Sequence, residues 1–355
     1  MNQKTHHSYT CHSYPNTMDT NLLETTAGAM VAPKKGILAA DESSKTIQKR
    51  FDKIGLQSTP ETNLGYRKML FTTPGIEEYI SGVILYDETI RQSIDLPAGR
   101  QGGVPIPQYL ESKGILPGIK VDQGAVDMPD FPSEKITEGL DGLKERLEEY
   151  RKLGAKFAKW RAVITIGQGI PTDACIEENA DRLAKYASLC QEAGIVPIVE
   201  PEVLMDADND LNKCREVTTK TLKKVFEKLA EHNVNLEGVI LKPNMVISGK
   251  KSATQATSKE IATATVETFL ETVPKEVPGI VFLSGGQTPD EATVNLSEIN
   301  LIPGSPWQLS YSYGRALQDE ALMTWAGKEE NVEAAQKAFL ERCKKVSLAR
   351  SSKIS

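Results

Sequence analysis

The stretch "IVPIVEPE" (residues 195–202) is followed by "DLNKCREVTTKTLKKVFEKLAEHN" (210–233) and then by "GVILKPNMV" (238–246). The first and third segments are short apolar runs rich in Val and Ile, which is typical of strands buried on both faces of a parallel sheet. The middle segment carries a stripe of apolar residues at helical spacing, formed by Val217, Leu222, Val225, Phe226 and Leu229. The three segments therefore predict a strand, a helix and a second strand.

The same alternation extends over most of the 355 residues. Eight apolar runs begin at intervals of roughly 30–45 residues, and they are 36–41, 82–88, 117–122, 157–164, 195–202, 238–246, 279–286 and 307–315. The segments between them have helical patterns, as in 133–154, 316–327 and 329–346. Eight repeats predict an α/β protein built as one closed (β/α)8 TIM barrel. An open, doubly wound sheet is the alternative, but no glycine fingerprint opens the first strand–helix unit to support it.

The domain boundaries follow from the same pattern. We expect a disordered N-terminal extension over residues 1–18, the barrel over 19–346 and a short C-terminal tail over 347–355. The segment "LPAGRQGGVPIPQ" (96–108) is rich in Gly and Pro, so we expect a surface loop that replaces or interrupts the second helix.

The composition excludes several classes of function. Lys and Arg total 42 against 48 Asp and Glu, and this net charge of -6 argues against nucleic acid and anionic membranes as partners. No apolar run reaches the ~18 residues of a membrane span, and the N-terminus lacks the apolar segment of a signal peptide. His232 is the single histidine beyond residue 12, and the five cysteines form no CxxC pair. We therefore expect a cytoplasmic protein without a metal site or a histidine-dependent hydrolase site.

Three of the predicted strands carry a lysine among their apolar residues. Lys242 follows four apolar residues and precedes a proline, and Lys159 and Lys120 have similar surroundings. Active sites of TIM barrels form where the strands end. Burial disfavours the charged ammonium, and crowding of three lysines favours a neutral, nucleophilic amine on one of them. These lysines are therefore candidates for a catalytic centre.

Carboxylates accompany these lysines. Asp41 ends the first run, and Glu200 and Glu202 end the fifth. Because Glu200 and Glu202 are two residues apart on a strand, both side chains point to the same side. They could neutralise the lysines in a buried network, or one of them could exchange protons with an imine-forming lysine. The two roles are compatible.

Two groups of small and hydroxyl residues predict anion sites. Strands seven and eight end in "LSGG" (283–286) and "SYGR" (312–315), and barrels commonly hold phosphate there. The first strand is followed by "DESSKTIQKR" (41–50), whose hydroxyls could cap a helix or, with basic neighbours, hold a second phosphate. Two such sites around the lysines suggest a substrate phosphorylated at both ends.

The motifs together resemble a known family. They are "GILAADES" (36–43), "GIKVD" (118–122), "FAKWR" (157–161), "IVPIVEPE" (195–202), "LEGVILKPNMV" (236–246), "FLSGGQ" (282–287) and "SYGRALQ" (312–318). In this order, over about residues 20–349, they are similar to class I fructose-1,6-bisphosphate aldolase. The resemblance implies reversible cleavage to dihydroxyacetone phosphate and glyceraldehyde 3-phosphate through a lysine Schiff base. It also implies that no cofactor is needed and that the protein is a homotetramer or other homo-oligomer.

The resemblance also implies roles for single residues. Lys242 matches the Schiff-base lysine, Glu200 the acid–base group, Asp41 the base that takes the hydroxyl proton, and Lys159 a supporting cation. The residues matched to the 1-phosphate site are Ser284, Gly285, Ser312, Gly314 and Arg315, and Gly286 adjoins them. The other substrate-binding residues are Ser43, Thr46, Arg50, Lys120, Arg161 and Glu202. Thr46 stands where the family has Ser, which keeps the hydroxyl.

Departures from the family and rival functions remain. The chain lacks the family's terminal Tyr, so slower proton exchange, or another group in its place, is expected. One rival is a Schiff-base aldolase that prefers another sugar, such as sedoheptulose bisphosphate or fructose 1-phosphate. The other is an inactive barrel used as a binding protein, which the joint presence of Asp41, Lys159, Glu200 and Lys242 argues against.

Overall fold

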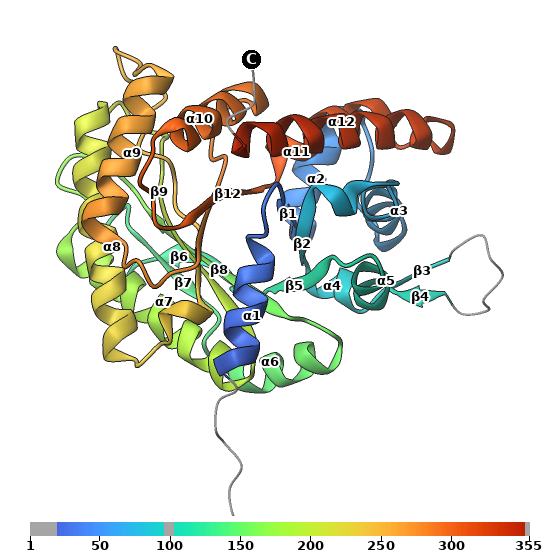
Figure 1. The fold of residues 1–355 in the computed structure, drawn as a ribbon, viewed down its shortest axis with the longest axis horizontal. Coiled ribbons are helices and arrows are strands. Elements are labelled where there is room, and N and C mark those ends of the chain that lie inside the picture. Colours follow the sequence, from blue (N-terminus) through green and yellow to red (C-terminus); the bar gives the residue numbers. More distant parts are fainter. Residues whose placement is uncertain (1–19, 96–102, 352–355) are drawn as a thin grey trace, which may run out of the picture.

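A computed structural model describes residues 20–95 and 103–351 (Figure 1). The expected N-terminal extension, residues 96–102 of the Gly/Pro-rich segment and the last four residues lie outside the described part. Eight parallel strands close a barrel in the order β1-β12-β11-β10-β9-β8-β5-β2. They are β1 (Gly36–Ala40), β2 (Ile80–Leu85), β5 (Leu116–Lys120), β8 (Phe157–Ile164), β9 (Val196–Val203), β10 (Ile240–Leu241), β11 (Gly279–Phe282) and β12 (Gln308–Tyr313).

The closed barrel confirms the predicted fold. Each of the eight predicted apolar runs contains or overlaps one barrel strand, in the same order. β1 pairs in parallel with both β2 and β12, and this second pairing closes the sheet and rules out the open alternative. Short parallel strands buried on both faces account for the continuous apolar runs.

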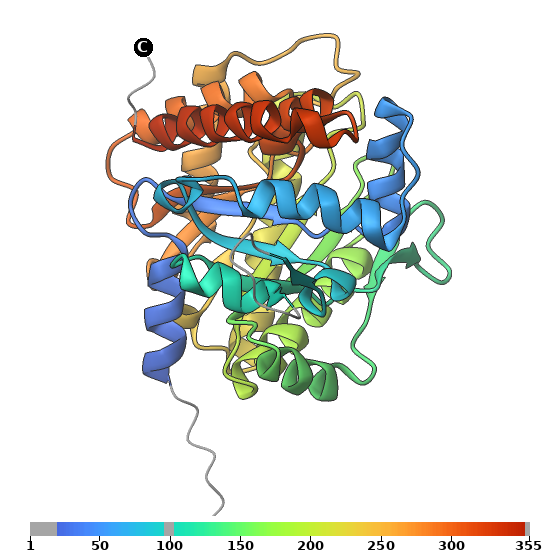
Figure 2. The same cartoon turned by 90° about the vertical axis from the view of Figure 1, so that its right-hand side faces the viewer.

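Helices surround the barrel (Figures 1 and 2). They are α1 (Thr20–Met30), α2 (Ser44–Phe51), α3 (Pro60–Phe71), α4 (Asp87–Ile90), α5 (Ile106–Ser112), α6 (Leu143–Lys152), α7 (Asp173–Glu192), α8 (Leu211–Glu231), α9 (Ser258–Thr272), α10 (Pro289–Leu301), α11 (Arg315–Trp325) and α12 (Val332–Arg350). The apolar stripe predicted between residues 210 and 233 is the buried face of α8. α12 lies beside α11 and α3, and it continues past the predicted tail boundary at residue 347.

The prediction of a helix over 133–154 is wrong for its first half. Residues Gly124–Asp127 (β6) and Lys135–Glu138 (β7) form an antiparallel hairpin instead, and α6 follows it. Gly139 and Gly142 have φ of 125° and 62°, which a right-handed helix cannot accommodate. The apolar residues at helical spacing therefore belong to two elements.

The loop expected over 96–108 is also wrong at its C-terminal end. Ser93–Ile94 (β3) pairs with Val104–Pro105 (β4), and α5 begins directly after β4. Pro107 stands in the first turn of α5, where proline is favoured because its missing N–H would have no helical partner. Pro105 and Pro107 therefore stand at the start of a helix.

α1 closes the barrel at the N-terminal ends of the strands. Its residues Leu23, Ala27 and Met30 are fully buried in one cluster with barrel-lining side chains such as Phe157 and Ile240. This plug leaves the opposite end, where the strands terminate, as the place for polar side chains. No helix in residues 20–95 and 103–351 is long and apolar enough to cross a membrane.

Candidate active site

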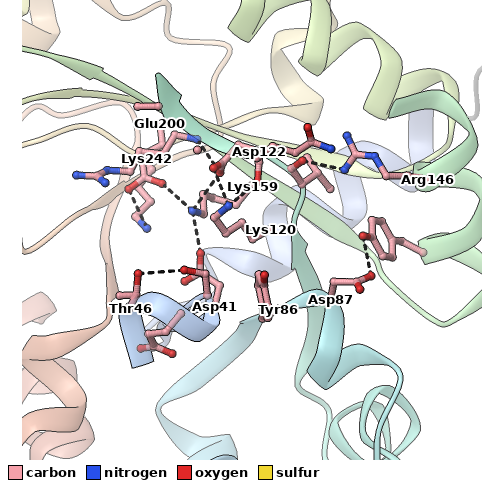
Figure 3. A pocket seen from close by; sticks show the side chains of 18 of the residues that line it. Asp41, Thr46, Tyr86, Asp87, Lys120, Asp122, Arg146, Lys159, Glu200 and Lys242 are labelled. Atoms are coloured by element: carbon pink, nitrogen blue, oxygen red, sulfur yellow. Dashed lines mark hydrogen bonds and ion pairs between the residues drawn. The ribbon is translucent and has the colours of Figure 1, made fainter. Parts of the chain in front are cut away.

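A cavity of about 770 Å³ opens at the C-terminal ends of the strands (Figure 3). It brings together nine residues selected from the sequence, which are Asp41, Ser43, Thr46, Arg50, Lys120, Lys159, Arg161, Glu200 and Lys242. They come from the adjacent strands β5, β8 and β9, from the residue after β10, from the loop after β1 and from α2. The structure therefore brings these nine residues together at one end of the barrel, where active sites of this fold form.

The strand pleat points the charged side chains inward. Lys159 and Arg161 line the cavity, whereas Trp160 between them faces outward and packs on Tyr186 with ring centroids 5.5 Å apart. The backbone N–H of Lys242 donates to the carbonyl of Val199 at 2.8 Å, which continues the β9–β10 ladder one residue beyond β10. The rigid sheet therefore sets where each amine lies.

Glu200 lies between two lysines. Its Oε1 is 3.1 Å from Lys242 Nζ, and its Oε2 is 3.7 Å from Lys159 Nζ. Lys159 Nζ is also 2.8 Å from Asp41 Oδ2 (Figure 3). The side chains of Glu200, Lys159 and Lys242 are each 4–5% exposed. A continuous chain of charges therefore runs from Lys242 through Glu200 and Lys159 to Asp41.

Asp122 belongs to this cluster, although the sequence analysis did not select it. Its Oδ2 is 3.6 Å from Lys159 Nζ, and its Oδ1 is 2.7 Å from Lys120 Nζ. Its position two residues after Lys120, at the end of an apolar run, was the available signal. With Asp122 included, three carboxylates accompany the three lysines.

This balance of charges determines the protonation of the cluster. Burial alone would raise the pKa of Asp41, but the nearby Lys159 and Lys242 outweigh it and hold that pKa well below its ordinary value. Burial would likewise lower the pKa of Lys159, but Asp41, Asp122 and Glu200 raise it above its ordinary value. Lys159 is therefore not the lysine on which a neutral amine is favoured, because three carboxylates lie beside it.

Glu202 has a different partner from Glu200. Its Oε2 accepts a hydrogen bond from Arg161 Nε at 2.5 Å, and the Arg161 side chain is 43% exposed. Burial would lower the pKa of Arg161, but Glu202 and Glu200 raise it. Of the two glutamates that share one side of β9, Glu200 is the one that contacts the lysines, and Glu202 orients Arg161.

α2 and its N-cap present hydroxyls at the start of the helix and one cation in its last turn to the cavity. Ser43 is at the N-cap position, but its side chain makes no capping hydrogen bond, and its Oγ lies 3.2 Å from Thr46 Oγ1. Arg50 NH1 is 2.6 Å from Glu42 Oε1. Burial would lower the pKa of Arg50, but Glu42 raises it. The capping role weighed for Ser43 is thus not seen, and both hydroxyls line the cavity.

The residues after β11 and β12 form a neighbouring group. Arg315 NH2 donates to the carbonyl of Gly285 at 2.5 Å, so the two predicted halves of the clamp are in contact. The N–H of Gly286 donates to Met205 Sδ at 3.0 Å. Within the described residues, Ser284, Gly285, Gly286, Ser312, Gly314 and Arg315 are not among those that line the 770 Å³ cavity.

The two groups meet at Gly314. A Cβ on Gly314 would lie 3.2 Å from Arg50 NH2, so glycine leaves room for that guanidinium. Residues 20–95 and 103–351 contain no group of three or more His, Cys, Asp or Glu side chains placed to hold a metal ion. The site is built from lysines, carboxylates, hydroxyls and glycines.

Comparisons with known proteins agree with this geometry. The family model for class I fructose-bisphosphate aldolase matches residues 22–355. The chain belongs to this family. A probable class 1 fructose-bisphosphate aldolase of Xanthomonas campestris pv. campestris is 53% identical over 333 residues, which cover 94% of this chain and 98% of the relative. The fructose-bisphosphate aldolase of Plasmodium falciparum is 50% identical over 329 residues, which cover 92% and 88%.

A solved structure supports the same assignment. The fructose-bisphosphate aldolase of Plasmodium falciparum, crystallised with TRAP and a small-molecule inhibitor, superposes with a TM-score of 0.91 at 49% identity. The match covers 94% of this chain and 95% of that one. The chain is thus a class I fructose-bisphosphate aldolase, a lyase with a (β/α)8 barrel.

Proposed function

We propose that Lys242 is the nucleophile of the aldolase and that Glu200 transfers the protons of imine formation. The contact that carries this proposal is the 3.1 Å distance between Lys242 Nζ and Glu200 Oε1, with both side chains about 5% exposed. In this pair a carboxylate can accept a proton from the ammonium and leave a free amine. The amine then attacks the ketone carbon to form a carbinolamine.

Glu200 then acts as the acid. It returns a proton to the hydroxyl of the carbinolamine, water leaves, and a protonated imine forms on Lys242. Its second oxygen faces Lys159 at 3.7 Å, so the carboxylate keeps a cation beside it after Lys242 has lost its charge. One carboxylate can therefore serve in both directions.

Asp41 is proposed as the base for cleavage. It takes the proton of the substrate hydroxyl next to the breaking bond, the aldehyde forms, and the electron pair of the carbon–carbon bond moves into the imine to give an enamine. Lys159 holds the pKa of this carboxyl well below its ordinary value, and Asp41 is therefore ionised. The base is therefore in its active form at neutral pH.

The substrate is proposed to be fructose 1,6-bisphosphate. Ser43 and Thr46 at the start of α2 and Arg50 in its last turn face the cavity. Arg315 with the Gly285–Gly286 turn adjoins it at Gly314. Two anion sites around one amine suit a sugar phosphorylated at both ends. The products would be dihydroxyacetone phosphate and glyceraldehyde 3-phosphate. We also propose that the enzyme is cytoplasmic, acts in glycolysis and gluconeogenesis, and forms a homotetramer or other homo-oligomer.

The imine can be trapped directly. Borohydride reduction with dihydroxyacetone phosphate, followed by peptide mass mapping, is expected to label the peptide that contains Lys242. Lys242→Met should remain folded by circular dichroism and lose both the label and essentially all cleavage. Lys156→Met, which alters a partly exposed lysine paired with Glu111, is the matched control and should be labelled like the wild type.

Three results would contradict the proposed imine mechanism. A label on Lys159, turnover by Lys242→Met at the wild-type rate, or activity abolished by EDTA would each overturn the mechanism. The specificity constants for fructose 1,6-bisphosphate, fructose 1-phosphate and sedoheptulose bisphosphate then establish the preferred substrate. A clear preference for one of the last two would overturn the proposed substrate but leave the imine in place.

A further inference from the structure

We propose that Gln318 is a positioning residue that holds the guanidinium of Arg50 in the substrate cavity. The inference rests on the proposed function, in which Arg50 binds a phosphate of the substrate. Gln318 lies in the first turn of α11 and is completely buried. It does not line the cavity itself, so any effect on substrate has to pass through a neighbour.

All four hydrogen-bonding positions of the Gln318 amide are occupied. Its Oε1 accepts from Arg50 NH1 at 3.2 Å and from Tyr66 OH at 3.0 Å. Its Nε2 donates to the carbonyl of Ala39 at 2.6 Å and to Glu42 Oε1 at 3.2 Å. A guanidinium only donates and a carbonyl only accepts, so these partners determine which end of the amide faces which neighbour.

The amide also affects how Glu42 neutralises Arg50. Glu42 Oε1 is 2.6 Å from Arg50 NH1 and accepts a second hydrogen bond from Gln318. The carboxylate is therefore shared between a cation and a neutral donor. Arg50 NH1 is shared in turn between Glu42 and Gln318, and this fixes the plane of the guanidinium. Its NH2 group lies beside Gly314, next to the residues after β12.

Gln318 further ties α11 to the end of β1. The pairing of β1 with β12 extends to Leu38 and Tyr313. One residue further along β1, the carbonyl of Ala39 accepts a hydrogen bond from Gln318 Nε2. Asp41 follows two residues later. One side chain thus contacts both the end of β1 and the helix residue Arg50.

A glutamine suits this position better than its nearest replacements. Methionine has a similar length but can make none of the four hydrogen bonds, so Arg50 would pair with Glu42 alone and turn toward it. Glutamate could still accept from Arg50 and Tyr66, but it could not donate to Ala39 or Glu42 and would place a second negative charge on Arg50. Either change should weaken binding of an anion by Arg50 and leave Lys242 and Glu200 in place.

The test is a double-mutant cycle on cleavage of fructose 1,6-bisphosphate. Gln318→Met and Gln318→Glu are each expected to raise KM about tenfold with kcat within about twofold, which is the signature of lost ground-state binding. In an Arg50→Met background, the same substitutions at Gln318 should have no further effect on KM, because they act through Arg50.

A matched variant separates positioning from stability. Gln191 is a buried glutamine far from the cavity, and its amide makes three hydrogen bonds to the backbone of Asn235 and Gly238. Gln191→Met should lower the unfolding temperature as Gln318→Met does, but KM should stay at the wild-type value. Should Gln318→Met fail to fold, Gln318→Glu, which retains both acceptor bonds, carries the test.

Three results would overturn the inference. They are an unchanged KM in both Gln318 variants, a KM effect that persists in the Arg50→Met background, and a similar KM effect in Gln191→Met. Each presupposes an active wild type. If the wild-type protein neither cleaves fructose 1,6-bisphosphate nor forms the Lys242 adduct, the proposed function fails and this inference fails with it.

Discussion

Replacement of Lys159 by methionine should destabilise the barrel by an amount that depends on pH. Lys159 Nζ is 2.8 Å from Asp41 Oδ2, 3.6 Å from Asp122 Oδ2 and 3.7 Å from Glu200 Oε2. The shortest of these contacts corresponds to about 6 kcal/mol of Coulomb attraction at an effective dielectric constant of about 20. The substitution removes that attraction and leaves three buried carboxylates in place.

The net loss is smaller than the Coulomb energy. Removal of one member of a buried ion pair costs about 3–5 kcal/mol, because the remaining charge stays desolvated. Here each carboxylate keeps a second lysine, since Lys242 Nζ is 3.1 Å from Glu200, Lys120 Nζ is 2.7 Å from Asp122, and Lys242 also acts on Asp41. We therefore expect the lower end, about 3 kcal/mol at pH 7.

The dependence on pH has a definite sign. The pKa of Asp41 is below its ordinary value of 3.8 in the folded wild type, so its contribution to stability is present above pH 3.8 and is lost as the pH falls further. The pKa of Lys159 is above 10.5, so its contribution is present below pH 10.5 and is lost as the pH rises through the folded-state pKa. The deficit of the variant should thus stay constant between about pH 5 and 9 and shrink at about pH 3.5.

Urea unfolding, followed by circular dichroism at a fixed protein concentration, measures this deficit. Lys159→Arg keeps the charge and should lose less stability than Lys159→Met. Lys156→Met, one residue before β8, removes a lysine that is 40% exposed and should cost under about 1 kcal/mol at every pH. A deficit below about 1 kcal/mol for Lys159→Met at pH 7, or one that grows on acidification, would refute the reasoning.

Two further predictions concern Glu200 and the glycine turn. Glu200→Gln preserves the shape of the side chain but cannot carry a proton, so kcat should fall by about 10²–10⁴. The rate of borohydride trapping should fall with it. Trapping at the wild-type rate would exclude Glu200 as the proton carrier. Gly285→Ala should lower the free energy of unfolding by about 1–3 kcal/mol and raise KM, because Gly285 has φ of 55° and a Cβ there would lie 2.3 Å from Met205 Cε. Gly114→Ala, at φ of 72° with open space around it, is the matched control, and an equal KM for both variants would contradict a role of the turn in binding.

The barrel could be predicted from the sequence because its strands are continuous apolar runs. Each run is buried on both faces, so its side chains are mostly apolar whatever the register of the strand and whichever strand it pairs with. The site followed from the same rule, since the C-terminal ends of barrel strands converge, and Lys159, Glu200 and Lys242 lie in β8, in β9 and directly after β10. These predictions required only the pattern of apolar and charged residues along the chain.

Features that depend on long-range contacts were not predictable in this way. The β6–β7 hairpin has apolar residues at helical spacing, and only the left-handed glycines at positions 139 and 142 separate it from α6. The burial of α1 in the barrel end depends on strands up to 250 residues away, among them β11, where Val31 packs against Gly279. The role of Asp122 likewise depends on Lys159, which lies on the adjacent strand.

The paired charges also explain how proton transfer can proceed without histidine in a buried site. Glu200 lies between Lys242 and Lys159, so it has a cation beside it whether or not Lys242 is charged. In the proposed step in which Lys242 gives its proton to Glu200, one positive and one negative charge disappear together, and the net charge of the cluster does not change. Since the cost of burial falls on uncompensated charge, this transfer avoids most of it. In the proposed mechanism, the carboxylates that surround Lys159 keep this lysine charged while the neighbouring Lys242 reacts.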